Sequence, residues 1–363
     1  MSPFERPDFV FVLVQPEATA WFKREHPELV LAFSRPGLLT FKNKQGHFAP
    51  DHRLETAFAR HWGFSLGRAT EPADVLALVD DALSALARGT AEPLRLHVYS
   101  RDEGESGQRL DPVVLDAVRE QISSAGGERF LREPTPREGD LVLDVILSPP
   151  RVNSDAGVEP ISEPWFIGWH RHTRERSLLP GGVSRATAPE RAPSRAWCKL
   201  EELLAWSGLP VRAGQTAVEI GCAPGGAVVN LVERGLHVIG IDPGAMDDGV
   251  AVIASSSSGS FEHLALKVGA VKREQLPAKV DWLLCDANLA PTVTLRYLAY
   301  WSKQLRPHLR GILFTLKLND DRMVESVPKL LARCGELGFG KARAVQLPSH
   351  RREIAVIASK RHR

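Results

Sequence analysis

The second half of the chain alternates between short apolar runs and segments whose apolar residues recur every three or four positions. These patterns predict strands over 216–220, 237–241, 263–266, 280–285 and 311–316, and helices over 196–205, 227–234, 292–305 and 323–337. Regular alternation of strands and helices predicts an α/β domain with a doubly wound, mostly parallel sheet of the Rossmann type. Two further apolar runs, 342–346 and 354–359, predict a late hairpin that gives this sheet an antiparallel edge strand.

The first half has a less regular pattern. It predicts strands over 9–14, 29–33, 38–41, 94–99, 141–147 and 165–169, and helices over 19–25, 54–62, 72–88 and 113–124. This mixed order is typical of small α+β units. A segment rich in Gly, Pro and Arg then indicates a linker. We therefore expect an N-terminal α+β domain over 1–70, a second domain over 71–177, a linker over 178–193 and the α/β domain over 194–363.

A glycine-rich turn follows the first strand of the α/β half. The residues Ala217-Val218-Glu219-Ile220-Gly221-Cys222-Ala223-Pro224-Gly225-Gly226 lead from strand to helix, and the next strand ends on Asp242. Glycines let backbone approach a ligand closely, and an acid after the second strand can hold two ribose hydroxyls. The spacing matches neither the dinucleotide pattern G-x-G-x-x-G nor the phosphate-binding pattern G-x-x-x-x-G-K-[ST]. A ligand with a ribose but no phosphate fits better, and S-adenosylmethionine is the candidate.

Charged residues follow the two strands that come next in the sheet. Asp286 follows the strand over 280–285, and Lys317 follows the strand over 311–316. Ligands of open parallel sheets bind beyond the carboxyl ends of the strands, so both residues are expected beside the glycine turn. A lysine at the end of a buried strand is costly unless it is paired or used. Lys199, before the first strand, and Glu353, at the start of the last, complete an ordered Lys–Asp–Lys–Glu set.

This set and its surrounding motifs resemble the FtsJ-like RNA ribose 2′-O-methyltransferases, and among them the ribosomal RNA large subunit methyltransferase M branch. The motifs are Ala192-Pro193-Ser194-Arg195, Lys199-Leu200-Glu201-Glu202, Ala223-Pro224-Gly225-Gly226, Asp242, Cys285-Asp286, Leu316-Lys317-Leu318 and His350-Arg351-Arg352-Glu353. The resemblance covers the C-terminal half strongly. It extends weakly to 71–177, which looks like the RNA-binding THUMP domain of that branch. It implies a SAM-dependent enzyme whose target is a cytidine ribose of large-subunit (23S) ribosomal RNA.

The four charged residues suit that reaction. A ribose 2′-hydroxyl is a poor nucleophile, so a base must take its proton as the hydroxyl attacks a sulfonium methyl group. Lys317 is the candidate base, although a lysine with its usual pKa of about 10.4 is protonated at neutral pH. We expect partial burial and the second cation, Lys199, to lower its pKa. Asp286 and Lys199 are expected to position the hydroxyl, Glu353 to orient one of the lysines, and no metal is needed.

The resemblance also implies a cofactor site. The methionine end is expected to contact Ser194 and the glycine turn, and Asp242 is expected to hold the ribose. The full expected set is Ser194, Glu219, Gly221, Cys222, Ala223, Pro224, Gly225, Gly226, Asp242 and Asp286. Ser194 also suits a plain helix N-cap, and Asp242 a turn at a strand end. The family usually places an acid near the adenine after the third strand, but residues 264–269 contain none.

Charge adds a candidate RNA surface. The net charge is only +2, which by itself does not indicate nucleic-acid binding, but basic residues gather between Arg171 and Arg195. Such local clusters suit a polyanion. We therefore expect RNA contacts from Arg171, Arg174, Arg176 and Arg195. Stacking on bases is open to Trp165, Trp169 and Trp197, but we expect these side chains to pack in the core.

The cysteine pattern favours a reducing compartment. Cys198, Cys222, Cys285 and Cys334 form no C-x-x-C pair, which argues against zinc sites and disulfides. The first 14 residues do not resemble a signal peptide, and no apolar run approaches the roughly 20 residues of a membrane span. We expect a cytoplasmic protein without metal or membrane association, most simply a monomer.

Three alternatives stay open. An RNA base (cytosine) methyltransferase on the same fold would use Cys285 or Cys222 as a nucleophile, although both are expected to be small buried residues. A non-catalytic RNA-binding ribosome assembly factor would explain the missing acid after the third strand. Methylation of the ribose of a messenger RNA cap shares the Lys–Asp–Lys–Glu set, but the N-terminal half argues mildly against it.

Overall fold

The computed structural model describes residues 2–85, 92–101, 110–148 and 163–360. They form two compact units, and the division falls between Arg185 and Ala186, inside the segment 178–193. Each unit is built on one seven-stranded sheet. Within the described ranges, every helix is too short or too polar to cross a membrane.

The sheet of the second unit has the strand order β10-β9-β8-β11-β12-β14-β13. Its strands are β8 (Thr216–Ile220), β9 (His237–Ile241), β10 (Ser260–Leu264), β11 (Trp282–Cys285), β12 (Gly311–Lys317), β13 (Arg343–Val345) and β14 (Glu353–Ser359). The five strands from β10 to β12 in this order are parallel, and β14 is antiparallel to both of its neighbours. The predicted doubly wound, mostly parallel sheet is confirmed. The late hairpin forms the predicted edge of the sheet: β14 pairs with β12 over its whole length, and the three-residue β13 is the outermost strand.

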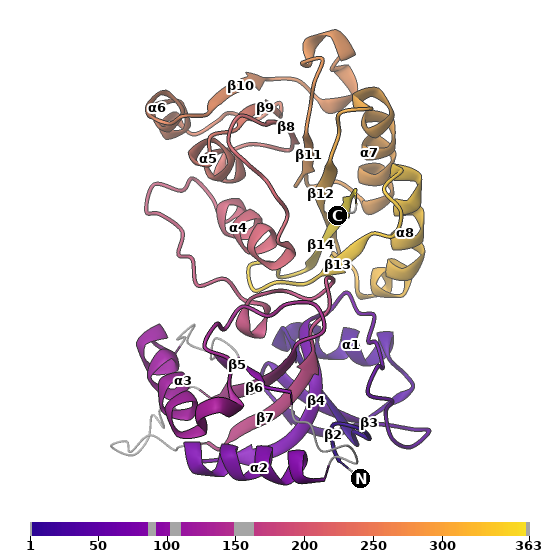
Figure 1. Ribbon diagram of the computed structural model, residues 1–363. Helices are drawn as coiled ribbons and strands as arrows, with labels where there is room; N and C mark the ends of the chain where they lie inside the picture. Colours follow the sequence, from indigo (N-terminus) through magenta and orange to yellow (C-terminus); the bar gives the residue numbers. More distant parts are fainter. Residues whose placement is uncertain (1, 86–91, 102–109, 149–162, 361–363) are drawn as a thin grey trace, which may run out of the picture. The chain divides into compact units, whose positions relative to one another are not determined.

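Helices cover both faces of this sheet. Figure 1 shows one group on one side and a second group on the other. The first group is α4 (Ala196–Ser207), α5 (Gly226–Glu233) and α6 (Asp248–Ser256), and the second is α7 (Pro291–Leu305) and α8 (Val327–Arg333). The pattern did not predict α6, which buries only Val250 and Ile253 and therefore shows little apolar periodicity. The loops at the carboxyl ends of β8, β9, β11 and β12 lie at one edge of the sheet, where open parallel sheets bind their ligands.

The sheet of the first unit has the order β2-β3-β1-β4-β7-β6-β5. Its elements are β1 (Phe9–Val14), α1 (Thr19–Glu25), β2 (Leu29–Arg35), β3 (Leu38–Asn43), β4 (Ala59–Ala69), α2 (Pro72–Ser84), β5 (Arg95–Ser100), α3 (Pro112–Gly126), β6 (Leu141–Leu147) and β7 (Trp165–Arg171). All pairs are antiparallel except β5 with β6. Strands from 1–70 and from 71–177 share this sheet. The separate THUMP-like domain over 71–177 stays a prediction. The end of the helix predicted over 72–88 lies outside the described residues.

The helix predicted over 54–62 is wrong. Its second half belongs to β4, which pairs with β1 on one side and β7 on the other. The strand is central, and at Gly63 a Cβ atom would lie 2.6 Å from the backbone oxygen of Trp169. Pairing on both edges and close packing of this kind override local propensity.

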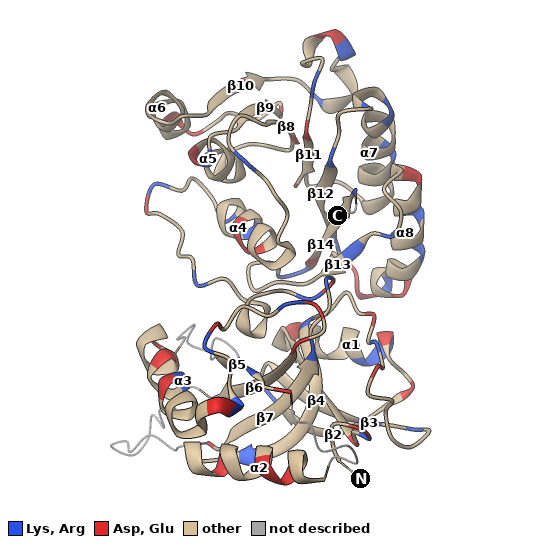
Figure 2. Ribbon diagram, in the orientation of Figure 1, with Lys and Arg blue, Asp and Glu red and all other residues tan. Residues whose placement is uncertain are grey.

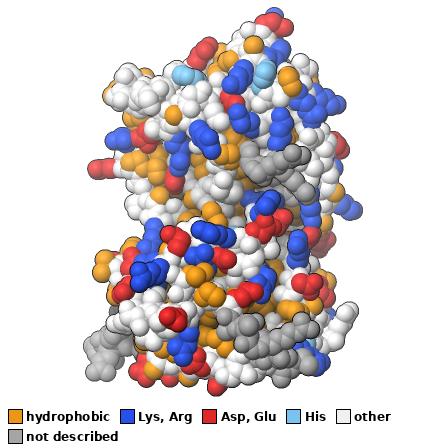
Figure 3. All heavy atoms as spheres, in the orientation of Figure 1, with side chains coloured by type: hydrophobic (Ala, Val, Ile, Leu, Met, Phe, Trp, Pro, Cys, Tyr) orange, Lys and Arg blue, Asp and Glu red, His pale blue; other side chains and the backbone are white. Residues whose placement is uncertain are grey.

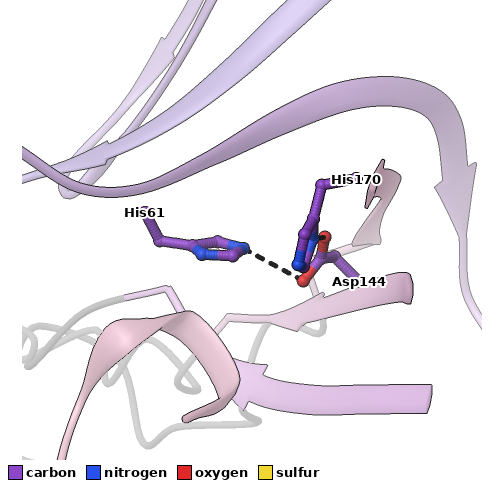
Figure 4. Close-up of side chains that lie close together, drawn as sticks. All are labelled: His61, Asp144 and His170. Atoms are coloured by element: carbon purple, nitrogen blue, oxygen red, sulfur yellow. Dashed lines mark hydrogen bonds and ion pairs between the residues drawn. The ribbon is translucent and has the colours of Figure 1, made fainter. Parts of the chain in front are cut away.

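A network of buried polar side chains ties four strands of the first unit together. Asp144 on β6 has no exposed surface, and its carboxylate accepts hydrogen bonds from His61 Nε2 (3.1 Å), His170 Nδ1 (2.6 Å) and the Tyr99 hydroxyl (3.1 Å). Figure 4 shows the two imidazoles beside the carboxylate. Each imidazole bonds to a different oxygen of Asp144, which is the geometry of two hydrogen bonds rather than of ligands converging on one ion. The network therefore joins β4, β5, β6 and β7.

Neutral histidines around this network predict that the first unit loses stability in mild acid. Burial lowers the pKa of His97 to about 4 and that of His172 to about 4. The unfolded chain takes up protons on these side chains below about pH 6.5 and the folded chain does not, so stability falls as the pH drops from 6.5 towards 4. For His97 alone we expect a loss of about 2 kcal/mol at pH 5.

Hydrogen exchange of β4, β6 and β7, measured by mass spectrometry at pH 7.5 and pH 5 and corrected for the intrinsic rate, checks this expectation. His26 acts in the opposite direction, because hydrogen bonds to Glu25 and Glu28 outweigh its burial and raise its pKa. A protection free energy that does not change between the two pH values would contradict the assignment of neutral histidines.

Candidate active site

The glycine turn between β8 and α5 is shaped by residues that tolerate no side chain. Gly221 (φ 82°) and Gly225 (φ 118°) both lie in the region that favours glycine. A Cβ at Gly221 would lie 2.6 Å from the Ala287 Cα, and a Cβ at Gly226 would overlap the side chain of Ser194. The turn therefore packs against the loop after β11 and the start of α4, and presents its backbone at the carboxyl end of the sheet.

Asp242 follows β9 and points its carboxylate towards the same turn. One oxygen accepts a hydrogen bond from the Ala223 amide (3.3 Å), and the other accepts one from the Gly244 amide (2.7 Å). A carboxylate has about four acceptor positions, so each oxygen can still accept one more donor. Asp242 is only half-buried, and it can therefore hold two hydroxyl groups of a ligand without losing its own contacts.

The four charged residues close into a ring. Lys199 Nζ lies 3.0 Å from Asp286 Oδ2 and 2.6 Å from Glu353 Oε1. Lys317 Nζ lies 2.7 Å from Asp286 Oδ1 and also contacts Glu353 Oε2. All four side chains are at least four-fifths buried, with exposures between 9% and 19%. Each lysine thus bridges both carboxylates, and the ring carries two positive and two negative charges.

Lys317 reaches the ring from the last position of β12, which pairs with Glu353, the first position of β14. Asp286 follows β11, the neighbouring parallel strand, and Lys199 projects from α4. Two strand ends, one strand start and one helix therefore bring together residues that are up to 154 positions apart, counted from Lys199 to Glu353. The sequence prediction that these four residues form one group agrees with this geometry.

The expected lowering of the Lys317 pKa was wrong. Burial does lower it, but Asp286 and Glu353 outweigh burial, and the pKa of Lys317 is raised. The pKa of Asp286 is lowered in turn, because the two lysines outweigh the burial of its carboxyl group. Lys317 is therefore protonated in this state, since its amine contacts two carboxylates.

Sequence reasoning missed two residues that belong to this site. The Thr315 hydroxyl donates to Asp286 Oδ1 at 2.6 Å. Thr315 lies two positions before Lys317, so both residues lie on one face of β12, and that spacing could have found it. His350 begins the motif that ends on Glu353, but no role was expected for its side chain. It lines the same cavity as Lys199, Glu219 and Asp286, and it is 1% exposed.

The cysteines of the site are not nucleophiles in this structure. Cys222 and Cys285 are 3% and 2% exposed. Burial raises the pKa of Cys285 to about 12, and it raises that of Cys222 well above its usual value. Protonated buried thiols are unreactive. The geometry therefore weighs against the cysteine-dependent base methylation that the sequence left open.

The four arginines expected to contact RNA differ in their surroundings. Arg171 and Arg174 are exposed and pair with Glu92 (3.3 Å) and Glu138 (2.5 Å). Arg176 instead donates to the Trp62 carbonyl (2.6 Å) and lies over the Trp62 ring, so it has a packing role. Arg195 is exposed beside Ser194 at the start of α4. Trp169 and Trp197 are buried, in agreement with core packing.

Basic and acidic residues are interspersed along the ribbon of each unit (Figure 2). On the face of the second unit that Figure 3 draws, basic side chains stand among hydrophobic and acidic ones. Neither view shows a single basic surface, so the RNA contacts have to be identified residue by residue.

Comparisons with known proteins agree with this site. The model of the FtsJ-like methyltransferase family matches residues 192–310, which include Lys199, the glycine turn and Asp286. Ribosomal RNA large subunit methyltransferase M of Azoarcus sp. (strain BH72) is 31% identical over 276 residues, 69% of this chain and 69% of the relative.

Two further relatives carry the same name. That of Alkalilimnicola ehrlichii is 34% identical over 189 residues (49% of each chain), and that of Thauera aminoaromatica is 38% identical over 167 residues (44% of this chain and 42% of the relative). The chain thus spans about half the length of these two relatives or less, and about two thirds of the Azoarcus protein. The chain belongs to the ribosomal RNA large subunit methyltransferase M family of FtsJ-like methyltransferases.

Proposed function

We propose that this chain transfers a methyl group from S-adenosylmethionine to a ribose 2′-hydroxyl of large-subunit (23S) ribosomal RNA, with a cytidine as the target. The observation that carries the proposal is the closed ring of Lys199, Asp286, Lys317 and Glu353 at the carboxyl ends of the strands. Its chemistry suits the removal of a hydroxyl proton, and the relatives are named for an activity on ribosomal RNA of the large subunit.

The residues around the turn fit the cofactor. S-adenosylmethionine, when bound, supplies an electrophilic methyl group on a sulfonium sulfur. Gly221 and Gly225 hold the turn in backbone conformations that favour glycine, and Asp242 keeps acceptor positions for two ribose hydroxyls. Glu219, which the sequence also placed in this set, lines a small buried cavity beside the charged ring. We place Ser194 and residues 221–226 at the methionine end of the cofactor. Backbone groups near β10 contact the adenine in this proposal.

Lys317 is the proposed base. Its amine loses a proton to solvent and then stays between the two carboxylates. Since those carboxylates raise its pKa, the free amine is a strong acceptor for the hydroxyl proton. Asp286 and Lys199 hold the attacking oxygen, and Glu353 contacts both lysines and fixes their positions. General-base help of this kind contributes about 10²–10⁴-fold.

The first unit is the proposed RNA-binding part. Arg171 and Arg174 lie exposed on and after β7, where they can exchange their acidic partners for phosphate, and Arg195 lies beside the proposed cofactor site of the second unit. RNA is recognised by its shape and by splayed single-stranded bases, which a separate α+β unit can present to an enzyme. Four free cysteines fit a cytoplasmic location.

Replacement of Asp242 tests the cofactor assignment. We expect Asp242→Ala to weaken S-adenosylmethionine binding at least about tenfold, because each hydrogen bond to a charged group contributes about 1.5–3 kcal/mol. Isothermal titration calorimetry measures the dissociation constant. Asp248→Ala, an exposed acid in the first turn of α6, is the matched control and is expected to bind as the wild type does. Equal affinities of the Asp242→Ala variant and the wild type would remove Asp242 from the site.

Incubation with purified ribosomal RNA tests the substrate. Unmodified large-subunit and small-subunit RNA are offered with labelled S-adenosylmethionine, and the modified nucleoside is identified by mass spectrometry. The proposal predicts 2′-O-methylcytidine in the large-subunit RNA. A methylated cytosine base, or cofactor binding with no transfer either to these RNAs or to intact ribosomal particles offered in a second series, would contradict it.

A further inference from the structure

A small cavity adjoins the charged ring of the second unit. It lies between α4, α5 and the strands β8, β11 and β12, and its polar lining comes from Lys199, Glu219, Asp286, Thr315 and His350. The remainder is apolar. Its volume is about 40 Å³, whereas one ordered water needs roughly 10–15 Å³. The cavity can therefore hold more than one water molecule.

Three polar atoms in the wall of this cavity have no partner among the described residues. They are Glu219 Oε2 and both ring nitrogens of His350. The two residues are 2% and 1% exposed, so bulk water does not reach them freely. Unpaired buried polar atoms are rare because each has lost its hydrogen bonds to water. A group that does satisfy them is therefore expected inside the cavity.

The charge of the wall decides what kind of group this is. Burial raises the pKa of Glu219 well above its usual value and lowers that of His350 to about 4, so both groups are neutral. Lys199 and Asp286 also face the cavity, but they neutralise each other at 3.0 Å. A neutral carboxyl group donates one hydrogen bond, and a neutral imidazole donates one and accepts one. The few polar groups in this mostly apolar lining carry no net charge, which suits water rather than an ion.

We propose that this cavity binds a cluster of ordered water molecules that connects His350 and Glu219 with Lys199 and Asp286, and that His350 is thereby a positioning residue for the ring. The inference rests on the proposed function, because the ring is where we place the proton transfer. Water held by His350 reaches the inner side of the ring, while the outer side remains available for a ribose hydroxyl. Loss of that water lets the Lys199 and Asp286 side chains move without disturbing the cofactor turn.

Two substitutions at one position test the role of His350. His350→Leu removes both nitrogens, and His350→Asn keeps one donor and one acceptor. We expect His350→Leu to lower kcat about tenfold or more while both KM values stay within about twofold, and His350→Asn to recover most of the loss. Leu203→Met, in the apolar wall of the same cavity, is the control and is expected to leave kcat unchanged. Equal losses in the Leu and Asn variants would mean that only packing matters, and would overturn the proposal.

A high-resolution crystal structure of the wild type gives a readout that does not depend on activity. It is expected to show water within hydrogen-bond distance of His350 and Glu219, and the structure of His350→Asn is expected to retain it. A dry cavity, or a cavity filled by a repacked side chain, would overturn the proposal. If the wild type binds cofactor but transfers no methyl group, the proposed function fails, and the crystal structure still decides the water site.

Discussion

Lys317→Ala is expected to lower the rate of methyl transfer at least about 10³-fold, in the middle of the range for general-base catalysis. The variant removes the proposed base, the amine that lies between Asp286 and Glu353. Single-turnover kinetics with saturating cofactor and RNA measures the effect on the chemical step. Because the pKa of Lys317 is raised, the wild-type rate is expected to increase with pH through the alkaline range, and this increase is expected to vanish in the variant.

The matched control is Lys303→Ala. Lys303 is exposed near the end of α7 and belongs to the same unit, so its removal changes the net charge equally without touching the ring. Cofactor affinity is expected to be the same in the wild type and both variants, which shows that the fold of the site survives. If Lys317→Ala keeps more than a tenth of the wild-type rate, Lys317 is not the base.

Asp144→Ala is expected to destabilise the first unit by about 3–5 kcal/mol, the usual cost of leaving a buried charge without its partner. Asp144 accepts hydrogen bonds from two histidines and a tyrosine, and its charge also acts on the buried guanidinium of Arg176. Removal of the carboxylate takes this acceptor from the two histidines and the tyrosine, and takes the opposite charge from Arg176. Hydrogen exchange in β4, β6 and β7 measures the loss within this unit alone.

Asp116→Ala is the control for this experiment. Asp116 pairs with Arg185 on an exposed part of the same unit, and exposed pairs contribute about 0–1 kcal/mol. If Asp144→Ala fails to fold, Asp144→Asn keeps one acceptor and is expected to give a smaller, measurable loss. A loss below about 1 kcal/mol for Asp144→Ala would show that the network does not support the unit.

Much of the fold could be predicted from the sequence because buried parallel strands leave continuous apolar runs. The strands β8, β9, β11 and β12 all appear where such runs predict them. The pattern failed where long-range pairing decides the structure. Residues 59–62 join a central strand although their local pattern also suits a helix, and β14 inserts between β12 and β13 because of pairing that no local pattern records.

The site could be predicted as a set of residues but not as an electrostatic arrangement. The order of Lys199, Asp286, Lys317 and Glu353 and the strand ends indicated which residues would lie together. The sequence does not give the distances between these side chains. Each lysine contacts two carboxylates, and for Lys317 these contacts raise the pKa that was expected to be lowered. The sequence likewise does not show that both ring nitrogens of His350 are buried without a partner among the described residues.

The central claim is that the methyl group goes to a ribose hydroxyl. Large-subunit RNA labelled by the wild type and by Lys317→Ala in parallel, followed by complete alkaline digestion, tests it directly, because a 2′-O-methyl group blocks cleavage at its own phosphodiester bond. The account predicts label in an alkali-resistant dinucleotide from the wild type and none from the variant. Label in ordinary mononucleotides would contradict it and place the methyl group on a base.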